Sequence, residues 1–322
     1  MTRLPQAFGI GLLGLLGLLG TGCNRNARKT VAVIPKGNAD LFWQSVHAGA
    51  AKAAAENKVD LVWDGPPNET EISIELQIVE TMINRRVDAI ALAPSDRSAL
   101  SNVVARASTE GIPVVIYDSA IDTDKYVSFI ATDNYAAGEL AGERMGQVLK
   151  AKGNIVMVKT TPGGASTTAR EQGFKHILQT KYPGIHILDE RFGMASVAQS
   201  LTVAENMLTA HPDLDGVFCS NESGSAGAMQ ALKSRGGKAK LVGFDWSPIL
   251  LDALKNGQID SLVIQNPFKM GEEAVNYSVK AIRHEKVEKR VNLPPRLITQ
   301  QNLNDPDVQA QVHPDLKKYL GQ

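Results

Sequence analysis

Polar and aromatic side chains stand at the ends of several apolar runs in this sequence, where they could form a chemical site. The segment LVGFDWSP places Asp245 between Phe244 and Trp246, just before Pro248. The carboxylate could simply cap a helix that begins near Pro248. Alternatively, the carboxylate and the two rings could together bind a ligand with apolar faces and many hydroxyl groups.

The same residue types recur after other apolar runs. Carboxylate, amide and guanidinium groups make strong, geometrically selective hydrogen bonds in a dry cleft, and aromatic rings cover the C–H faces of a pyranose or furanose. Any single aspartate could instead be a helix cap, and one of the two adjacent rings at 42 and 43 could belong to the core. Caps do not explain the arginine, the glutamine and the Phe-Asp-Trp triplet, so the recurrence favours a binding site. The candidates are Asp40, Phe42, Trp43, Asp118, Arg170, Asn221, Phe244, Asp245, Trp246 and Gln265.

The elements that must position these residues follow a βα repeat. Short runs rich in Val and Ile alternate with amphipathic segments of helical period, which predicts doubly wound parallel sheets. Nine or ten such units are too many for one open sheet at this length, so we expect two similar α/β lobes with a cleft between them. The residues after each strand then face the cleft, because ligands bind at the carboxyl ends of parallel strands. The strand-like runs are 31–35, 61–63, 89–93, 113–117, 154–158, 185–188, 216–219, 240–244 and 261–264, and a break between lobes falls near FIATDN at 129–134.

Composition excludes some classes of protein. The 322 residues include 34 Lys plus Arg and 34 Asp plus Glu, a balance that argues against a nucleic-acid binder. The hydrophobic content of 43% is typical of a globular chain. The two cysteines are Cys23 and Cys219, and the first lies in the targeting segment, so no disulfide is expected within the folded body.

The N-terminus predicts export. Arg3 precedes an uncharged, glycine-rich apolar run too short for a comfortable membrane span, which is typical of a signal peptide over residues 1–22. Thr21 and Gly22 before Cys23 resemble a bacterial lipobox, although Gly20 stands at the usual leucine position. We expect lipidation of Cys23, a polar tether over 23–29 and a location in the periplasm or cell envelope. An ordinary signal peptide with an incidental cysteine is the alternative. Apart from the anchor, no membrane contact is expected.

Motifs for other functions are missing. The turn after the first strand, PKGNAD, has one glycine and not the G-x-G-x-x-G of a dinucleotide site, and no P-loop occurs. Cys219 has no histidine beside it in sequence, and the six histidines form no H-E-x-x-H, so we predict no enzyme, no cofactor and no metal site. A repressor would need a helix-turn-helix where the signal segment stands.

Several motifs occur in an order that resembles a known family. ADLFWQSVHAGAAKAA holds paired aromatics, and ALAPSD, IPVVIYDS and IATDNYAAGELAG follow it. ASTTAREQGF holds the arginine, SNESGSAGA the asparagine, LVGFDWSP the Phe-Asp pair and LVIQNPFKMGEEAV the glutamine. From about Val31 to about Ile298 the chain is similar to the periplasmic sugar-binding proteins of ABC transporters, of the ribose/galactose-binding type.

The resemblance implies roles for the candidate residues. Phe42 and Trp43 would stack on the ligand, with Phe244 as an additional ring, while the polar residues at 118, 170, 221, 245 and 265 would bind hydroxyl groups and the ring oxygen. Ribose-type members often have asparagine at the position of Asp40 or Ala93 and arginine at that of Ser119. Their second-lobe aromatic falls near Ala195, where Phe192 or Trp246 could substitute. The resemblance therefore implies a sugar or polyol, without specifying ribose.

The resemblance also implies a mechanism. Residues 30–132 plus 266–291 would form one lobe and 133–265 plus 292–322 the other, joined by hinges near 132–134, 264–266 and 290–294. The ligand would bridge the lobes and favour the closed form, which would dock as a monomer on an ABC permease. A sensor that presents its ligand to a chemoreceptor or histidine kinase would have the same lobes and remains the alternative.

Overall fold

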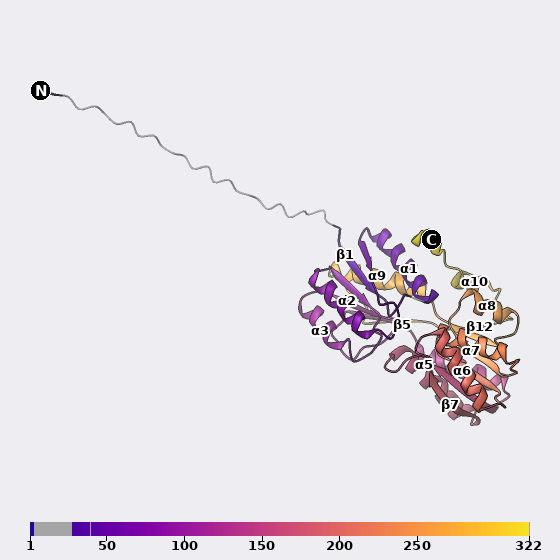
Figure 1. Ribbon diagram of the computed structural model, residues 1–322. Coiled ribbons are helices and arrows are strands. Elements are labelled where there is room, and N and C mark those ends of the chain that lie inside the picture. The colour runs from indigo at the N-terminus through magenta and orange to yellow at the C-terminus, as the bar shows by residue number, and fades with distance from the viewer. Residues whose placement is uncertain (3–27, 39, 322) are drawn as a thin grey trace.

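The computed structural model describes residues 1–2, 28–38 and 40–321, which form two α/β lobes joined by short crossovers (Figure 1). Most of the predicted signal segment and Cys23 lie outside the described residues. The two-lobed α/β architecture expected from the βα repeat is confirmed. Within the described part of the chain, no helix is long and apolar enough to cross a membrane.

The N-terminal lobe is built on a six-stranded sheet in the order β11-β5-β4-β3-β1-β2, with every pair of neighbours parallel. Its central strands are buried along their whole length, as their nearly continuous apolar sequences predict. The strands are β1 (Thr30–Ile34), β2 (Asp60–Trp63), β3 (Ala89–Leu92), β4 (Val114–Tyr117), β5 (Ser128–Thr132) and β11 (Arg290–Leu293).

The helices of this lobe cover both faces of its sheet. Successive strand residues point to opposite faces: Val31 and Val33 contact the cluster under α1 and α9, and Ala32 and Ile34 the cluster under α2 and α3. The helices are α1 (Leu41–Asn57), α2 (Ile72–Asn84), α3 (Ser101–Thr109) and α9 (Pro267–Ile282).

The C-terminal lobe repeats this plan with a six-stranded sheet in the order β12-β10-β9-β8-β6-β7. Only β12 is antiparallel to its neighbour. The reason is the crossover: β11 ends at the cleft, so the chain enters the second sheet there and β12 runs away from the cleft. The strands are β6 (Lys152–Lys159), β7 (Gly184–Phe192), β8 (Gly216–Cys219), β9 (Lys240–Phe244), β10 (Ser261–Ile264) and β12 (Arg296–Thr299).

Two layers of helices cover the second sheet, with separate hydrophobic clusters on its two faces. Helices α4 and α5 pack together at unusually short range, since a Cβ at Gly138 would lie 2.0 Å from the Arg170 carbonyl oxygen. The helices of this lobe are α4 (Asn134–Val148), α5 (Ala165–Lys181), α6 (Val197–Ala210), α7 (Glu222–Ser234), α8 (Pro248–Lys255) and α10 (Pro306–Val312).

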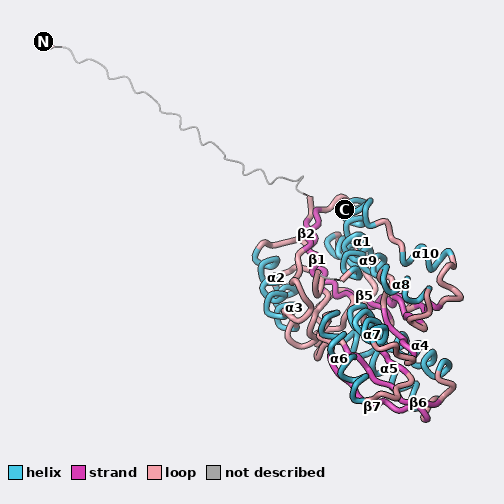
Figure 2. The backbone as a smooth tube through the Cα atoms, turned by 45° about the vertical axis from the view of Figure 1, so that its right-hand side comes forward, coloured by secondary structure: helices cyan, strands magenta, loops and turns pink. Residues whose placement is uncertain are grey.

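The lobe boundaries differ from the expected ones at two places. Residues 292–293 belong to β11 and pair with β5, so they extend the N-terminal lobe. Helix α11 (Leu316–Leu320) returns to that lobe and packs against α1, and the ring of Tyr319 lies 5.6 Å from that of Phe268 in α9. The C-terminus therefore lies beside α1 in both views (Figures 1 and 2). Neither β11 nor α11 has the long apolar run that revealed the other elements.

Candidate ligand-binding site

A cavity lined by residues of both lobes lies between them. Its lining includes residues within two positions of the ends of β4, β8, β9 and β10, so the carboxyl ends of both sheets meet there. Eight of the ten predicted residues line it: Asp40, Phe42, Trp43, Asp118, Arg170, Asn221, Asp245 and Gln265.

The N-terminal lobe supplies an ion pair and two rings. The Asp118 carboxylate is 2.6 Å from the Lys36 ammonium group, and both side chains are about 95% buried. Phe42 and Trp43 begin α1 and meet edge to face, with ring centroids 4.9 Å apart. Trp43 is also part of the lobe's core, and its Nε1 donates a hydrogen bond to Glu69 Oε1 at 2.9 Å. Trp43 therefore lines the cavity and belongs to the core at the same time.

The C-terminal lobe supplies planar polar groups. Gln265 Nε2 donates to Asp245 Oδ1 at 2.7 Å, and its Oε1 accepts from the Thr132 hydroxyl at 2.8 Å. Arg170 donates from Nε to Asn134 Oδ1 and from Nη1 to the Ser220 carbonyl, each at 2.8 Å. These bonds hold the guanidinium in place before any ligand arrives, which lowers the entropy lost on binding.

Polar contacts also join the two lobes around the cavity. Ser166 Oγ accepts from Lys36 Nζ at 3.1 Å and from the Ser119 hydroxyl at 2.8 Å. The Phe42 N–H donates to Glu222 Oε2 at 3.2 Å. Since these bonds span the cleft, the structure corresponds to a closed arrangement of the lobes.

Burial governs the electrostatics of the site. It raises the pKa of Asp40 to about 7, with further increases from the charges of Glu69 and Asp245. It raises the pKa of Glu222 to about 9, and the neighbouring Asp40 and Asp245 add to the effect. The pKa of Asp245 is also raised by burial, although Arg170 and the Gln265 hydrogen bond oppose the shift.

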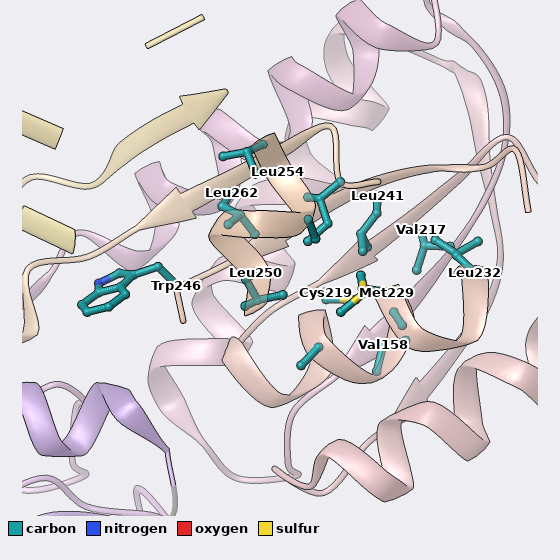
Figure 3. Packing of buried hydrophobic residues seen from close by; sticks show 14 of the residues in the cluster. Val158, Val217, Cys219, Met229, Leu232, Leu241, Trp246, Leu250, Leu254 and Leu262 are labelled. Carbon is teal, nitrogen blue, oxygen red and sulfur yellow. The ribbon is translucent and has the colours of Figure 1, made fainter. Parts of the chain in front are cut away.

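Phe244 and Trp246 do not line the cavity, contrary to the expectation from the sequence. Phe244 is fully buried below the sheet, where its ring supports the Arg170 guanidinium at 4.7 Å. Trp246 belongs to the hydrophobic cluster of Leu250 and Leu262 (Figure 3). The two rings lie in the clusters on opposite faces of the sheet, because the left-handed backbone of Asp245 interrupts the strand alternation between them.

The alternative of simple helix caps applies to Asn221 but not to Asp245. Ser247 is the N-cap position of α8, so Asp245 does not cap this helix. Asn221 Oδ1 does accept from the Gly224 N–H at 2.9 Å at the start of α7. It therefore caps a helix and lines the cavity at the same time.

The structure adds five lining residues that sequence reasoning missed: Lys36, Glu69, Ser166, Thr167 and Glu222. Lys36 lies two residues beyond the first strand and Glu222 directly after Asn221, so their positions at strand ends could have indicated them. Glu69 lies in the loop before α2, and no local pattern marks it. Among the residues that the structure describes, no aromatic side chain of the C-terminal lobe lines the cavity; Phe192 instead lies below Lys159, 4.3 Å from its ammonium group.

Other candidate chemistry is not assembled in the described residues. Cys219 is fully buried in a hydrophobic cluster, and burial raises the pKa of its thiol, which keeps it protonated (Figure 3). Among residues 28–38 and 40–321, no group of three or more His, Cys, Asp or Glu side chains is arranged to hold a metal ion.

Comparison with known proteins agrees with this geometry. The periplasmic binding protein domain matches residues 31–286. The chain belongs to the type I periplasmic sugar-binding proteins. Family membership indicates a location outside the cytoplasm. The ribose import binding protein of Bacillus subtilis (strain 168) is 29% identical over 259 residues, which cover 80% of this chain and 83% of that protein.

Solved structures of family members are similar over the whole folded body. A solute-binding protein from Agrobacterium vitis with bound D-fucose has a TM-score of 0.86 at 35% identity and covers 88% of this chain and 100% of its own. A carbohydrate transporter solute-binding protein from Agrobacterium radiobacter in complex with D-arabinose has a TM-score of 0.87 at 31% identity, with 89% and 100% covered. These relatives are binding proteins of transport systems and not enzymes.

Proposed function

We propose that this protein binds a monosaccharide or related polyol in the interlobe cavity and delivers it to an ABC permease. The observation that carries the proposal is the cavity itself, where aromatic rings from one lobe face planar hydrogen-bonding groups from the other. Asp118, Arg170, Asn221, Asp245 and Gln265 supply partners for several hydroxyl groups of a small ligand.

The mechanism follows from the crossovers between the lobes. Gln265 lies on one crossover, contacts Thr132 at another and holds Asp245 in the cavity. A ligand that bonds to both lobes adds its contacts only in the closed form, so binding shifts the population towards closure. The closed surface would then be recognised by the permease, with the protein acting as a monomer.

A thermal-shift screen tests the binding function. Pentoses, hexoses, deoxysugars, inositols, linear polyols and amino sugars are added in turn to the purified protein. A ligand that binds only the folded state raises the melting temperature, by an amount that corresponds to about 2.7 kcal/mol at a hundredfold excess over Kd. Stabilisation by at least one member of the panel is expected. No stabilisation by any of them contradicts the proposal.

We also propose that a lipid on Cys23 keeps the protein at the membrane beside its permease. The supporting observation is the lipobox-like sequence before Cys23, which lies outside the described residues. Cys23→Ser is expected to release the protein into the soluble fraction after cell fractionation, while Cys219→Ser leaves its distribution unchanged. Retention of the Cys23→Ser variant on membranes contradicts the anchor.

A further inference from the structure

The charges that line the cavity do not balance. Two cationic side chains, Lys36 and Arg170, face five carboxyl groups. The carboxyl groups belong to Asp40, Glu69, Asp118, Glu222 and Asp245. A site for an uncharged sugar needs no such excess of acids.

Both cations are already paired. Lys36 lies 2.6 Å from Asp118, and Arg170 lies 3.7 Å from Asp245. The remaining three carboxyl groups have no cationic side chain within 4.0 Å among the residues that the structure describes. Within this part of the chain, therefore, the excess acids are not neutralised by the protein itself.

The three remaining carboxyl groups gather around the first turn of α1, although they come from distant parts of the chain. Asp40 is the N-cap residue, yet its carboxylate makes no capping hydrogen bond. Glu222 reaches across from the other lobe to the Phe42 N–H, and Glu69 accepts from the Trp43 indole. The helix N-terminus offsets only about half of one negative charge. Glu222 is 9% exposed, so its carboxyl group is largely shielded from water.

An isolated buried carboxylate is costly unless it is paired or protonated. Protonation meets part of the need, because burial raises the pKa of Glu222 to about 9 and that of Asp40 to about 7. The pKa of Glu69 is raised as well, chiefly by burial, against the opposing effects of nearby Lys36 and the Trp43 hydrogen bond. With the pKa of Asp40 at about 7, the first turn of α1 carries part of a negative charge at neutral pH that a ligand could neutralise.

We propose that the ligand is a cationic polyol, an amino sugar or aminocyclitol of monosaccharide size, whose ammonium group lies among Asp40, Glu69 and Glu222. The inference rests on the proposed sugar-binding function and names its substrate class. Three carboxyl groups around one ammonium match its three N–H donors. An organic cation fits better than a metal ion, because the described carboxyl groups are not arranged as a metal site.

Matched ligands test the charge requirement. Each amino sugar or aminocyclitol is compared with its parent polyol, which lacks the amine, and with its N-acetyl derivative, which keeps the nitrogen without the charge. The series places the amine at carbons 1, 2, 3 and 6 in turn, so that each of these positions of the ammonium group is tested. Affinity is measured by calorimetry at pH 7. At least one amine is expected to bind about tenfold or more tightly than both neutral analogues, since hydrogen bonds to charged groups are stronger than neutral ones.

Variants separate this effect from general damage to the site. Glu69→Gln and Asp40→Asn are expected to reduce or abolish the preference for the amine, measured in each variant as the ratio of its affinities for the amine and for the parent polyol. Glu80→Gln removes an exposed carboxylate of α2 that pairs with Arg106 outside the cavity, and it should leave the preference unchanged. Calorimetry in two buffers of different ionisation enthalpy should show proton release when the amine binds, because the ammonium replaces protons on Asp40 and Glu222.

The outcomes distinguish the two proposals. A neutral sugar that binds as tightly as every amine overturns the cationic ligand and leaves the sugar-binding function standing. Binding of amines with an undiminished preference in the Glu69→Gln and Asp40→Asn variants also overturns the inference. The absence of binding across charged and neutral polyols overturns the sugar-binding function together with it.

Discussion

The two lobes share one plan and divide the site between them. Asp118 and Asp245 follow equivalent strands, β4 and β9, and both have a left-handed backbone with φ of 61° and 62°. Each donates its N–H to the next strand at 2.9 Å, to Ile130 and Val263 respectively. Each also lies beside a buried cation. The repeated fold therefore places an aspartate at the same point on both sides of the cleft.

The residues around the two aspartates differ. At the start of α1 the N-terminal lobe has Phe42 and Trp43, whereas the equivalent helix α5 has Ser166 and Thr167. Lys36 contacts Asp118 directly, whereas Arg170 is held chiefly by Asn134 and Ser220. One lobe thus supplies rings and most of the carboxyl groups, and the other supplies planar hydrogen-bonding groups. The two lobes therefore have equivalent backbones at the cavity but complementary side chains.

The largest expected difference between the lobes lies in the stability of their ion pairs. Asp118→Asn leaves the buried Lys36 ammonium without its carboxylate and should cost about 3–5 kcal/mol of the free energy of unfolding. Asp245→Asn should cost less, about 1–3 kcal/mol, because Arg170 keeps its bonds to Asn134 and Ser220. Denaturant titration measures both, and asparagine preserves the left-handed backbone. Equal losses would show that the two pairs are equivalent after all.

Asp245→Ala should in addition remove most of the affinity for the ligand while the fold survives. Calorimetry with the best ligand of the thermal-shift panel measures this loss. Unchanged affinity would exclude Asp245 from the site.

The pH dependence of stability should differ between the lobes. Burial raises the pKa of Glu75 to about 7, against the hydrogen bonds from Ser95. The folded state then holds a proton that the unfolded state has lost, so stability falls as the pH rises from about 4.5 to about 7. Glu75→Gln should therefore stabilise the protein by about 3 kcal/mol at pH 8 and by little at pH 4.

Glu171→Gln in the C-terminal lobe is the matched comparison. Burial raises the pKa of Glu171 too, but the Ser220 hydrogen bond and the charges of Lys159 and Lys175 oppose it. Melting temperatures from pH 4 to pH 8 measure the stability of both variants. If stability increases more with pH for Glu171→Gln than for Glu75→Gln, the expected difference between the lobes is wrong.

A smaller difference between the lobes is expected where two helices pack closely together in each of them. A Cβ at Gly138 would lie 2.0 Å from the Arg170 carbonyl, and one at Gly49 would lie 1.9 Å from the Phe268 carbonyl. Either alanine should cost about 1–3 kcal/mol of stability through overpacking. Gly138→Ala should also weaken ligand binding more than Gly49→Ala, because its new methyl group would displace the backbone of Arg170 itself, whereas Phe268 does not line the cavity. Thermal melting measures the loss of stability and calorimetry the loss of ligand affinity. Equal losses of affinity in Gly138→Ala and Gly49→Ala would contradict the expected difference between the two helix contacts.

The smallest effect on ligand affinity is expected from side chains at the cavity-facing N-termini of α1 and α5. Phe42→Ala removes an aromatic face from the cavity and should weaken ligand binding by about 1 kcal/mol, or roughly fivefold. Ser166→Ala removes hydrogen bonds to Lys36 and Ser119 between the lobes and should have an effect of at most that size. Calorimetric titration ranks them, and a greater loss for Ser166→Ala would mean that closure matters more than stacking.

The sequence alone determined the repeated βα plan and most of the site. Buried parallel strands require nearly continuous apolar runs, and their carboxyl ends must meet at one edge, so residues such as Asp118, Asn221 and Gln265 could be identified before any coordinates. These signals are local. The chain itself carried less information about β11, β12 and α11, because short elements that complete an edge or return across a cleft take their stability from partners far away in sequence.

Only the tertiary structure decided which side chains face one another. Phe244 and Trp246 flank Asp245 in sequence, yet both rings turn into the core while Asp245 turns to the cavity. Glu69 and Glu222 come from different lobes and meet at the first turn of α1, where no sequence pattern would place them. The charge of the cavity is a sum over such distant residues, so it is a property of the assembled lobes and not of any segment of the chain.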